Sequence, residues 1–353
     1  MYIQFRVDAS LKIGTGHVAR CLTLAEELTK NGIECSFICK KSIGDLIEFI
    51  QSKGFKVFII NNLEIEKNKN KNVSNANIDA MRTIDIIKKQ TKTVDWIIVD
   101  HYMIDFEWEK IVRPHTGKIL VIDDLADRKH ECDLLIDSTY SKNTKRYDSL
   151  VDENVKLLCG TEYAILKPEF IKYRKKYLTI SKPIKIHVFF GGNDINNYTC
   201  KFSELILKNI DEVVLKVVTA SGYTYSQELD YIKSIYGEKI EIEHNVSDMA
   251  KYMSECDVAI GSPGITTWER ACIGLPSAYL YTNINQKKIL ENLSSDHFCF
   301  YIGDASKINS KDFLLKARIF LNQKKVLNEM FVIGQNSVDG LGTNRILTSI
   351  LRF

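Results

Sequence analysis

The sequence is poor in net charge, in long apolar runs and in paired cysteines. Among its 353 residues, 48 Lys and Arg face 45 Asp and Glu, which leaves a net charge of +3. So small a charge excludes a dedicated nucleic-acid-binding protein. Apolar runs such as Ile97–Val99 are only a few residues long, so none can cross a bilayer. The strand-like sequence directly after Met1 leaves no room for a signal peptide, and we expect a cytoplasmic protein with no membrane partner.

The nine cysteines include no C-x-x-C motif. The closest pair, Cys35 and Cys39, lies within an apolar segment, and no doublet has zinc-like spacing. A chain of this length does not need disulfides to complete a core, so we expect buried free thiols in a reducing compartment. Heptad repeats are also missing, and together with the near-neutral charge this predicts a monomer.

The sequence does have ordinary globular composition, with 45% hydrophobic and 26% charged residues. At ~150 residues per domain its length indicates two domains. In the first half, short apolar runs alternate with amphipathic stretches, and this βαβα order indicates a parallel sheet with helices on both faces. The strand candidates are 3–7, 35–39, 56–60, 96–100, 118–123 and 134–137.

The pattern starts again after a charged, Tyr-rich stretch that ends at Pro183, which predicts a linker near 175–184. The later strand candidates are 184–190, 213–219, 239–245, 257–262 and 277–282. We therefore predict an α/β fold of two Rossmann-like domains, 1–178 and 184–353, facing each other across a cleft, with ligands at the carboxyl ends of the strands. The polar stretch 61–79 has the composition of an exposed insertion.

A first glycine turn, GTGHVAR at Gly14–Arg20, opens a predicted helix. It formally satisfies G-x-G-x-x-A, the dinucleotide-binding pattern. However, the residues Asp8–Ile13 separate it from the strand end at Val7, and the second strand ends in Lys40–Lys41 instead of an acid that could hold a ribose. We therefore expect no NAD and no other cofactor.

His17 lies at the start of that helix, where backbone amides favour a neutral histidine. A neutral imidazole beside a glycine loop can take a proton from water. The alternative, that His17 only caps or packs the helix start, is about equally supported by the sequence. Asp8, just after the first strand, is a candidate either to orient His17 or to structure the loop.

A second motif, GSPGITTWER at 261–270, follows a strand and precedes a helix. Its small residues let backbone amides approach an anion at the helix N-terminus, which suits a diphosphate. The hydroxyls of Ser262, Thr266 and Thr267 add donors, and Glu269 is placed to accept hydrogen bonds from two ribose hydroxyls. The alternative is an ordinary N-cap followed by a helix-start Glu.

Two further segments end strands at the edge where α/β sheets place ligands. One is FFGGNDINN at 189–197, the counterpart of the 14–17 loop, which is either a binding loop or a simple turn. The other is Asp100-His101-Tyr102, which either contacts a ligand or supports neighbouring loops.

Acidic residues crowd the segment 123–133, but their spacing matches neither H-E-x-x-H nor an EF-hand loop. Arg128 and Lys129 lie among them and repel a cation. We therefore predict a loop held by Asp–Arg pairs and no metal site.

Six segments together resemble the UDP-sugar hydrolases of bacterial pseudaminic acid biosynthesis. They occur in the family's order and cover most of 1–286: FRVDASLKIGTGHVARCLTLAEEL, VDHYMID, IDDLADRKHECDLLID, CGTEYAILKPEF, FFGGNDINN and GSPGITTWERACIGLPS. This family is similar in fold to GT-B glycosyltransferases, particularly the one that adds N-acetylglucosamine in lipid II synthesis. The resemblance implies hydrolysis of UDP-2,4-diacetamido-2,4,6-trideoxy-β-L-altropyranose to UDP and the free sugar, by water attack at the anomeric carbon with inversion.

The resemblance also implies roles for individual residues. His17 is the general base, Tyr102 and Asn197 line the sugar pocket, and Glu269 holds the uridine ribose. No metal is required, because loop amides and a helix N-terminus can stabilise the departing UDP. The substrate-binding set is Gly14, Gly16, Arg20, Tyr102, Gly191, Asn197, Ser262, Gly264, Thr266, Thr267, Glu269, Asn285 and Gln286.

Other functions remain open on the same fold. The first alternative is a UDP-sugar-dependent GT-B glycosyltransferase, and a 2-epimerase or a nucleotide-sugar-binding regulator follows. The resemblance thins after about residue 290, where the sequence predicts two helices around a Gly-rich turn. We expect the last of these helices to pack back on the first domain.

Overall fold

Buried, largely β-branched runs such as Trp96–Asp100 form the strands of two parallel sheets. The computed structural model describes residues 1–60, 75–141, 143 and 145–353. The chain forms two units, each around its own sheet: one comprises Met1–Ile165 with Gly342–Phe353, and the other comprises Leu166–Leu341. The α/β fold class predicted from the sequence is confirmed.

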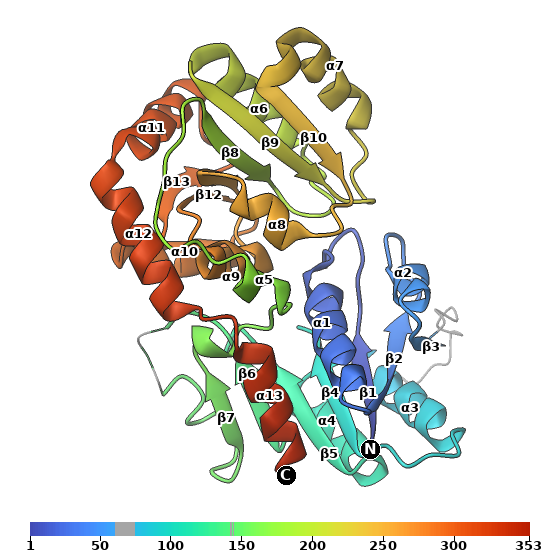
Figure 1. Ribbon diagram of the computed structural model, residues 1–353. Coiled ribbons are helices and arrows are strands. Elements are labelled where there is room, and N and C mark those ends of the chain that lie inside the picture. Colours follow the sequence, from blue (N-terminus) through green and yellow to red (C-terminus); the bar gives the residue numbers. More distant parts are fainter. Residues whose placement is uncertain (61–74, 142, 144) are drawn as a thin grey trace. The chain divides into compact units, whose positions relative to one another are not determined.

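The sheet of the first unit has seven parallel strands in the order β3-β2-β1-β4-β5-β6-β7 (Figure 1). Alternate residues of its strands enter two separate cores, so Ile98 packs with α1 whereas Ile97 and Val99 pack with α3 and α4. The strands are β1 Tyr2–Val7, β2 Glu34–Lys40, β3 Lys56–Ile60, β4 Trp96–Asp100, β5 Lys118–Ile122, β6 Leu134–Asp137 and β7 Lys156–Cys159. The helices are α1 Gly16–Lys30, α2 Ile47–Ser52, α3 Asn75–Lys88, α4 Phe106–Val112, α13 Gly342–Leu351 and the short 3-10 turns η1 Arg113–His115 and η2 Thr161–Tyr163.

The last helix, α13, belongs to the first unit, where it packs on α1 and η2 (Figure 1). Its start approaches the chain before it so closely that a Cβ on Gly342 would lie 2.3 Å from the carbonyl oxygen of Ala164. Ile346 and Ile350 then enter the core beneath α1. Only glycine fits at the point where this helix docks.

The sheet of the second unit has six parallel strands in the order β10-β9-β8-β11-β12-β13. The strands are β8 Ile184–Phe189, β9 Val213–Thr219, β10 Ile240–His244, β11 Val258–Gly261, β12 Ser277–Tyr281 and β13 Phe300–Asp304. The helices are α5 Glu169–Lys172, α6 Tyr198–Asn209, α7 Ser226–Tyr236, η3 Gly237–Lys239, α8 Met249–Ser254, α9 Ile265–Ile273, α10 Asn285–Ser295, α11 Ser310–Asn322 and α12 Lys324–Ser337.

The predicted strands are all present, but β7 and β13 were not predicted. Two helices were expected at the end of the chain, and the structure has three. The backbone leaves the helical region at Gln323 (φ −90°, ψ 70°), which separates α11 from α12. In both sheets the strand order reverses at one point, between β1 and β4 in the first and between β8 and β11 in the second. Such a change in strand order is where open α/β sheets bind ligands.

Two predicted boundaries differ from the observed ones. The first unit ends at Ile165 and not at 178, because Arg174 donates to the carbonyl oxygen of Val338 at 2.6 Å and the amide of Lys175 to that of Ile273 at 2.9 Å, both within the second unit. Of the predicted insertion 61–79, residues 61–74 lie outside the described residues. Its last five residues begin α3, where Asp79 pairs with Arg6 at 2.6 Å.

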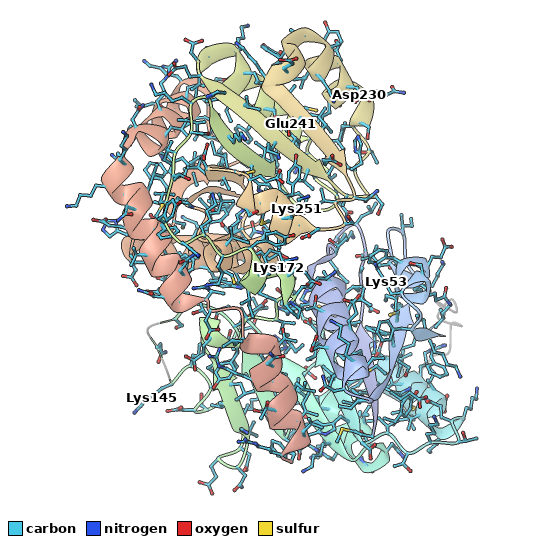
Figure 2. The ribbon with its side chains drawn as sticks, in the orientation of Figure 1. Lys53, Lys145, Lys172, Asp230, Glu241 and Lys251 are labelled. Carbon is cyan, nitrogen blue, oxygen red and sulfur yellow. The ribbon has the colours of Figure 1, made fainter. Side chains whose placement is uncertain are left out.

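All nine cysteines are free thiols, and only Cys159 among them is not buried. Charged side chains such as Lys53, Asp230 and Glu241 point outward from their units (Figure 2). Within the described ranges, no helix has both the length and the apolar character needed to cross a membrane.

Candidate functional site

The strand-order change of the first unit brings His17 to Asp100. β1 and β4 are neighbours, with Val7 opposite Asp100, so the loop after β1 runs past the end of β4. Gly14 (φ +83°) closes that loop by donating to the carbonyl oxygen of Ser10 at 2.8 Å, and α1 then starts at Gly16. The glycine turn thus places His17, the second residue of α1, beside the last residue of β4.

The imidazole of His17 is held by a buried carboxylate. Its Nδ1 lies 2.6 Å from Oδ1 of Asp100, and both side chains are almost fully buried. Burial opposes ionisation of Asp100, but the nearby Arg20 and His17 outweigh it and hold the pKa of Asp100 well below its usual range. An ionised carboxylate only accepts, so Nδ1 carries the proton and Nε2 is left as the basic nitrogen. None of the described residues bonds Nε2.

Arg20, one turn further along α1, clamps the same carboxylate. Its Nε and Nη2 each lie 2.6 Å from an oxygen of Asp100, and its Nη1 lies 3.1 Å from Asp124. The guanidinium fork is therefore used on two carboxylates. These hydrogen bonds show that Arg20 positions Asp100, and the substrate contact predicted for Arg20 stays a prediction.

Tyr102 closes the other side of the imidazole. Its ring stands edge-on to His17 with the ring centres 4.5 Å apart, and its hydroxyl donates to Asp124 at 3.2 Å. Burial raises the pKa of Tyr102, so the hydroxyl keeps its proton. One contiguous polar cluster is thus formed from the start of α1, the end of β4 and the loops after β4 and β5; its members are His17, Arg20, Asp100, Tyr102 and Asp124.

Asp8 belongs to a different cluster and does not orient His17. Both its oxygens accept from Arg6, at 2.6 and 2.9 Å, and it also accepts from the amide of Lys40 at 2.7 Å. His101 Nε2 lies 3.2 Å from it. Burial acts against ionisation, but Arg6 and His101 hold the pKa of Asp8 well below its usual range. Of the two roles left open for Asp8, the structure supports the loop-structuring one.

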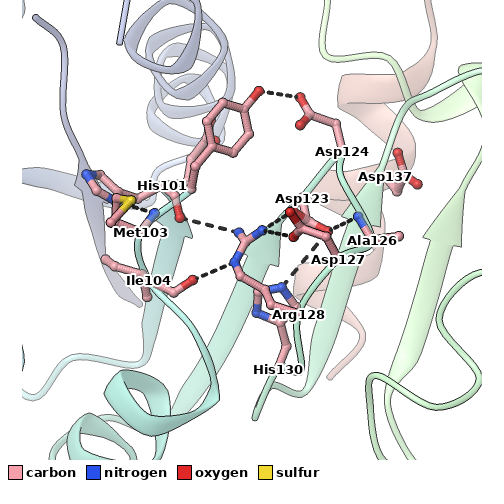
Figure 3. A network of polar contacts seen from close by, with 12 residues as sticks. His101, Met103, Ile104, Asp123, Asp124, Ala126, Asp127, Arg128, His130 and Asp137 are labelled. Atoms are coloured by element: carbon pink, nitrogen blue, oxygen red, sulfur yellow. Dashed lines mark hydrogen bonds and ion pairs between the residues drawn. The ribbon is translucent and has the colours of Figure 1, made fainter. Parts of the chain in front are cut away.

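The acidic segment after β5 is a loop held by Asp–Arg pairs, as predicted. Arg128 bonds Asp123 at 3.0 Å and Asp127 at 2.9 Å, and it also donates to the carbonyl oxygen of Ile104 at 2.8 Å (Figure 3). Below it, buried His130 contacts Glu109 at 2.7 Å. Among the residues with described positions, no group of His, Cys, Asp or Glu is arranged to hold a metal. This network fixes the loop that carries Asp124.

The second unit repeats the arrangement where β8 and β11 lie side by side, with Phe189 opposite Gly261. A Cβ on Gly261 would lie 2.0 Å from the carbonyl oxygen of Phe189, so only glycine allows this approach. Gly191 (φ +102°) follows β8, and the position of its Cβ would be 3.9 Å from Oγ of Ser262. The two predicted glycine loops of this unit therefore lie next to each other.

The helix α9 starts directly from these loops. Gly264 caps it, and its amide donates to Oγ1 of Thr267 at 3.2 Å, while the first turn contains no acidic residue. Glu269 is partly buried and has no hydrogen-bond or ion-pair partner among the described residues. Burial raises its pKa to about 7, although Arg270 and Lys167 act in the opposite direction. A free carboxylate one turn into the helix fits the predicted ribose acceptor.

Two other predicted residues, Asn197 and Gln286, have partners within the second unit. Asn197 (φ +53°) caps α6, and its side chain bonds Tyr223 at 2.8 Å and Glu228 at 2.7 Å. Gln286 ties the loop after β12 to the loop after β11 through Pro263 at 3.1 Å. Asn285 is the first residue of α10. The contacts of these residues with a substrate stay predictions.

Sequence reasoning missed the orienting role of Asp100 and did not select Asp124. Each stands at or just after the end of a buried strand, where a carboxylate is a signal for the ligand edge of a parallel sheet. What the sequence lacked was the order of the strands, which decides which loops meet.

Comparison with known proteins gives relatives at moderate similarity, and no protein-family model matches the chain. The uncharacterized protein MJ1062 of Methanocaldococcus jannaschii is 30% identical over 308 residues, 84% of this chain but only 60% of that protein. The UDP-2,4-diacetamido-2,4,6-trideoxy-β-L-altropyranose hydrolase of Campylobacter jejuni is 27% identical over 262 residues, 74% of this chain and 84% of the hydrolase. The spore coat polysaccharide biosynthesis protein SpsG of Bacillus subtilis is 22% identical over 363 residues, 100% of this chain and 98% of SpsG.

Solved structures share the fold at lower identity. The MurG of Acinetobacter baumannii superposes with a TM-score of 0.67 at 15% identity, covering 100% of this chain and 99% of MurG. The structure of TcCGT1 in complex with UDP superposes with a TM-score of 0.66 at 9% identity, covering 99% of both chains. By sequence the chain is thus a homologue of the Campylobacter hydrolase and of SpsG, and by structure it has a GT-B-like α/β fold.

Proposed function

We propose that the protein hydrolyses a UDP-sugar to UDP and the free sugar, with UDP-2,4-diacetamido-2,4,6-trideoxy-β-L-altropyranose as the first candidate substrate. The observation that carries the proposal is the His17–Asp100 pair, in which the carboxylate fixes Nδ1 at 2.6 Å and leaves Nε2 without a partner among the described residues. The homologous Campylobacter hydrolase bears the name of this substrate.

In this reaction His17 acts as the general base. A water molecule gives a proton to Nε2 while its oxygen forms a bond to the anomeric carbon, and the bond between that carbon and UDP breaks on the opposite face, which inverts the configuration. The imidazolium that forms is stabilised by Asp100. Arg20 holds the pair in place through its hydrogen bonds to Asp100. Tyr102 holds it through its ring contact with His17, and the Tyr102 hydroxyl is fixed by Asp124.

The second unit holds the UDP part. The amides at the start of α9, with Ser262 and Thr266, supply donors for the diphosphate, and Glu269 accepts from the ribose hydroxyls. The charge that develops on the departing UDP is stabilised by these groups, so neither a general acid nor a metal is required. This differs from the two-carboxylate arrangement of most glycosidases.

The direct test is UDP release from UDP-2,4-diacetamido-2,4,6-trideoxy-β-L-altropyranose without any acceptor, with and without EDTA. We expect release at the same rate in both cases, with an inverted free sugar as the first product seen by NMR. Binding of UDP without any release contradicts hydrolysis and favours transfer to an acceptor. Release that stops with EDTA contradicts the metal-free mechanism.

The ribose contact predicts a pH dependence of uridine binding. Because burial raises the pKa of Glu269 to about 7, the carboxylate is protonated below this value and ionised above it. The ionised form makes stronger, charge-assisted hydrogen bonds to the two hydroxyls than the protonated form, so the affinity for uridine should rise about ten-fold between roughly pH 6 and pH 8. Uridine is the ligand of choice because it has no phosphate, whose own titration would also change the affinity with pH. Calorimetry should show a flat profile for Glu269→Gln, and a wild-type affinity that is independent of pH would exclude the ribose role.

The second candidate is a UDP-sugar-dependent glycosyltransferase. It is favoured by the similarity of the fold to MurG and to TcCGT1 in complex with UDP. In that case His17 takes the proton of an acceptor hydroxyl in place of that of water. The UDP-release assay separates the two, because a transferase turns over only when the acceptor is added.

A further inference from the structure

Arg270 is a fully buried guanidinium that lacks a carboxylate partner. It lies on α9 with 0% exposure, and its Nη2 donates to Nδ1 of His187 at 3.2 Å and to the carbonyl oxygen of Phe189 at 3.5 Å. The ring of Tyr279 lies 5.3 Å from its central carbon. In the described part of the chain, neither Nε nor Nη1 has a hydrogen-bond partner.

Arg270 has no counter-ion at bonding distance in the described part of the chain, although the carboxyl of Glu269, next to it in sequence, interacts with its charge. Burial, together with Arg270 and Lys216, lowers the pKa of His187 well below its usual value, so the ring is neutral. The other buried cation of this face, Lys216, is paired with Glu255 at 2.7 Å and with Glu241 at 3.4 Å. A guanidinium keeps its charge when buried, and an uncompensated buried charge is strongly unfavourable. The unit thus pairs one buried cation and leaves the other unpaired.

The unpaired charge lies beneath the glycine loops of the second unit. A Cβ on Gly261, the last residue of β11, would be 3.1 Å from Nη2 of Arg270. Phe189, whose carbonyl oxygen accepts from the same nitrogen, is the last residue of β8. Ser262 follows Gly261 directly, and Gly191 lies two residues after Phe189. The positive end of α9 and the guanidinium therefore act on the same loops, and the first turn of α9 holds no acid to offset them.

We propose that Arg270 is a positioning residue whose charge is compensated by the diphosphate of the bound nucleotide, which it attracts through the electric field beneath the loops and not by direct contact. The inference rests on the proposed function, in which the second unit holds UDP. It adds that Arg270 makes the protein prefer nucleoside diphosphates to monophosphates and nucleosides. The electrostatic contribution of Arg270 to the affinity grows with the negative charge of the ligand.

The test compares Arg270→Met with Lys216→Met, which removes the same charge from a buried but paired position. Calorimetry measures the affinities for UDP, UMP and uridine. The titrations are made at roughly pH 9, well above the pKa of Glu269, so that this carboxylate stays ionised when Arg270, which lowers its pKa, is removed. For Arg270→Met we then expect UDP binding about ten-fold weaker, UMP affected less and uridine unchanged. For Lys216→Met we expect unchanged UDP binding and a lower melting temperature, because Glu255 and Glu241 lose their partner. Arg270→Lys should retain more UDP affinity than Arg270→Met.

The melting temperature of ligand-free Arg270→Met should equal or exceed that of the wild type, because an unpaired buried charge has been replaced by an apolar side chain. Wild-type UDP affinity in Arg270→Met overturns the inference, as does an equal loss for UDP and uridine. If Arg270→Met does not fold, Arg270→Gln replaces it beside Arg270→Lys. A wild-type protein that binds none of the three ligands overturns the proposed function itself, whereas wild-type binding that Arg270→Met leaves unchanged overturns only the role of Arg270.

Discussion

The variant His17→Ala is expected to lower kcat by about 10²–10⁴-fold while UDP binding stays at the wild-type level. The base is lost, but the groups proposed to hold UDP belong to the second unit and are untouched. Initial rates of UDP release measure the first effect, and calorimetric titration with UDP measures the second. This separation distinguishes an enzyme from a nucleotide-sugar-binding regulator, in which removal of His17 would have no catalytic consequence.

Imidazole in the buffer sharpens the test of His17. The truncated side chain leaves space beside Asp100, which remains clamped by Arg20 at 2.6 Å and can hold a free imidazole in the same orientation. Added imidazole should therefore restore part of the activity of His17→Ala and none of that of His17→Phe, whose ring fills the space. A variant His17→Ala that keeps more than about a tenth of the wild-type kcat would place the general base elsewhere.

The fully buried strands could be predicted well from the sequence because they consist mainly of apolar residues. Trp96–Asp100 and Leu134–Asp137 are fully buried on both sides, and their apolar runs match the observed bounds. In contrast, β7 and β13 were missed although each contains a short apolar run, Leu157–Cys159 and Phe300–Ile302. Both are edge strands with mixed exposure, but so are β3 and β10, which were predicted, so their place at the sheet edge does not explain why they were missed.

The candidate site was only partly predictable, because its pairs join residues far apart in sequence. His17 and Asp100 are separated by 83 positions, and they meet only because β4 lies beside β1. Asp8 was the nearer choice to orient His17. Arg6 on β1 lies two residues before Asp8, which directly follows the strand, so alternation along the extended chain puts both side chains on the same face; this spacing was the available signal that Asp8 already had a partner. His17 could be proposed as the base from the glycine turn, whereas the carboxylate that holds it could be found only from the strand order.

The variant Asp100→Asn should reduce kcat by about 10³–10⁴-fold, although His17 is still present. The amide of asparagine can donate to Nδ1, which then carries no proton, so the proton moves to Nε2 and the nitrogen that faces water can no longer accept. UDP binding should be unchanged. An Asp100→Asn variant with near wild-type kcat would show that the 2.6 Å contact does not set the tautomer of His17.

Loss of activity in Asp100→Asn has a second possible cause, because Arg20 loses the carboxylate that it clamps at 2.6 Å through two nitrogens. Breaking such a buried pair on one side costs at most about 3–5 kcal/mol of unfolding free energy, since Arg20 keeps Asp124 at 3.1 Å as its second carboxylate. Arg20→Met added to Asp100→Asn removes that charge, so urea denaturation should show a recovery of stability in the double variant. The kcat should not recover, because the tautomer of His17 is still reversed. Recovery of both would mean that Asp100 serves the fold and not the proton transfer, whereas recovery of stability alone assigns Asp100 to the orientation of His17.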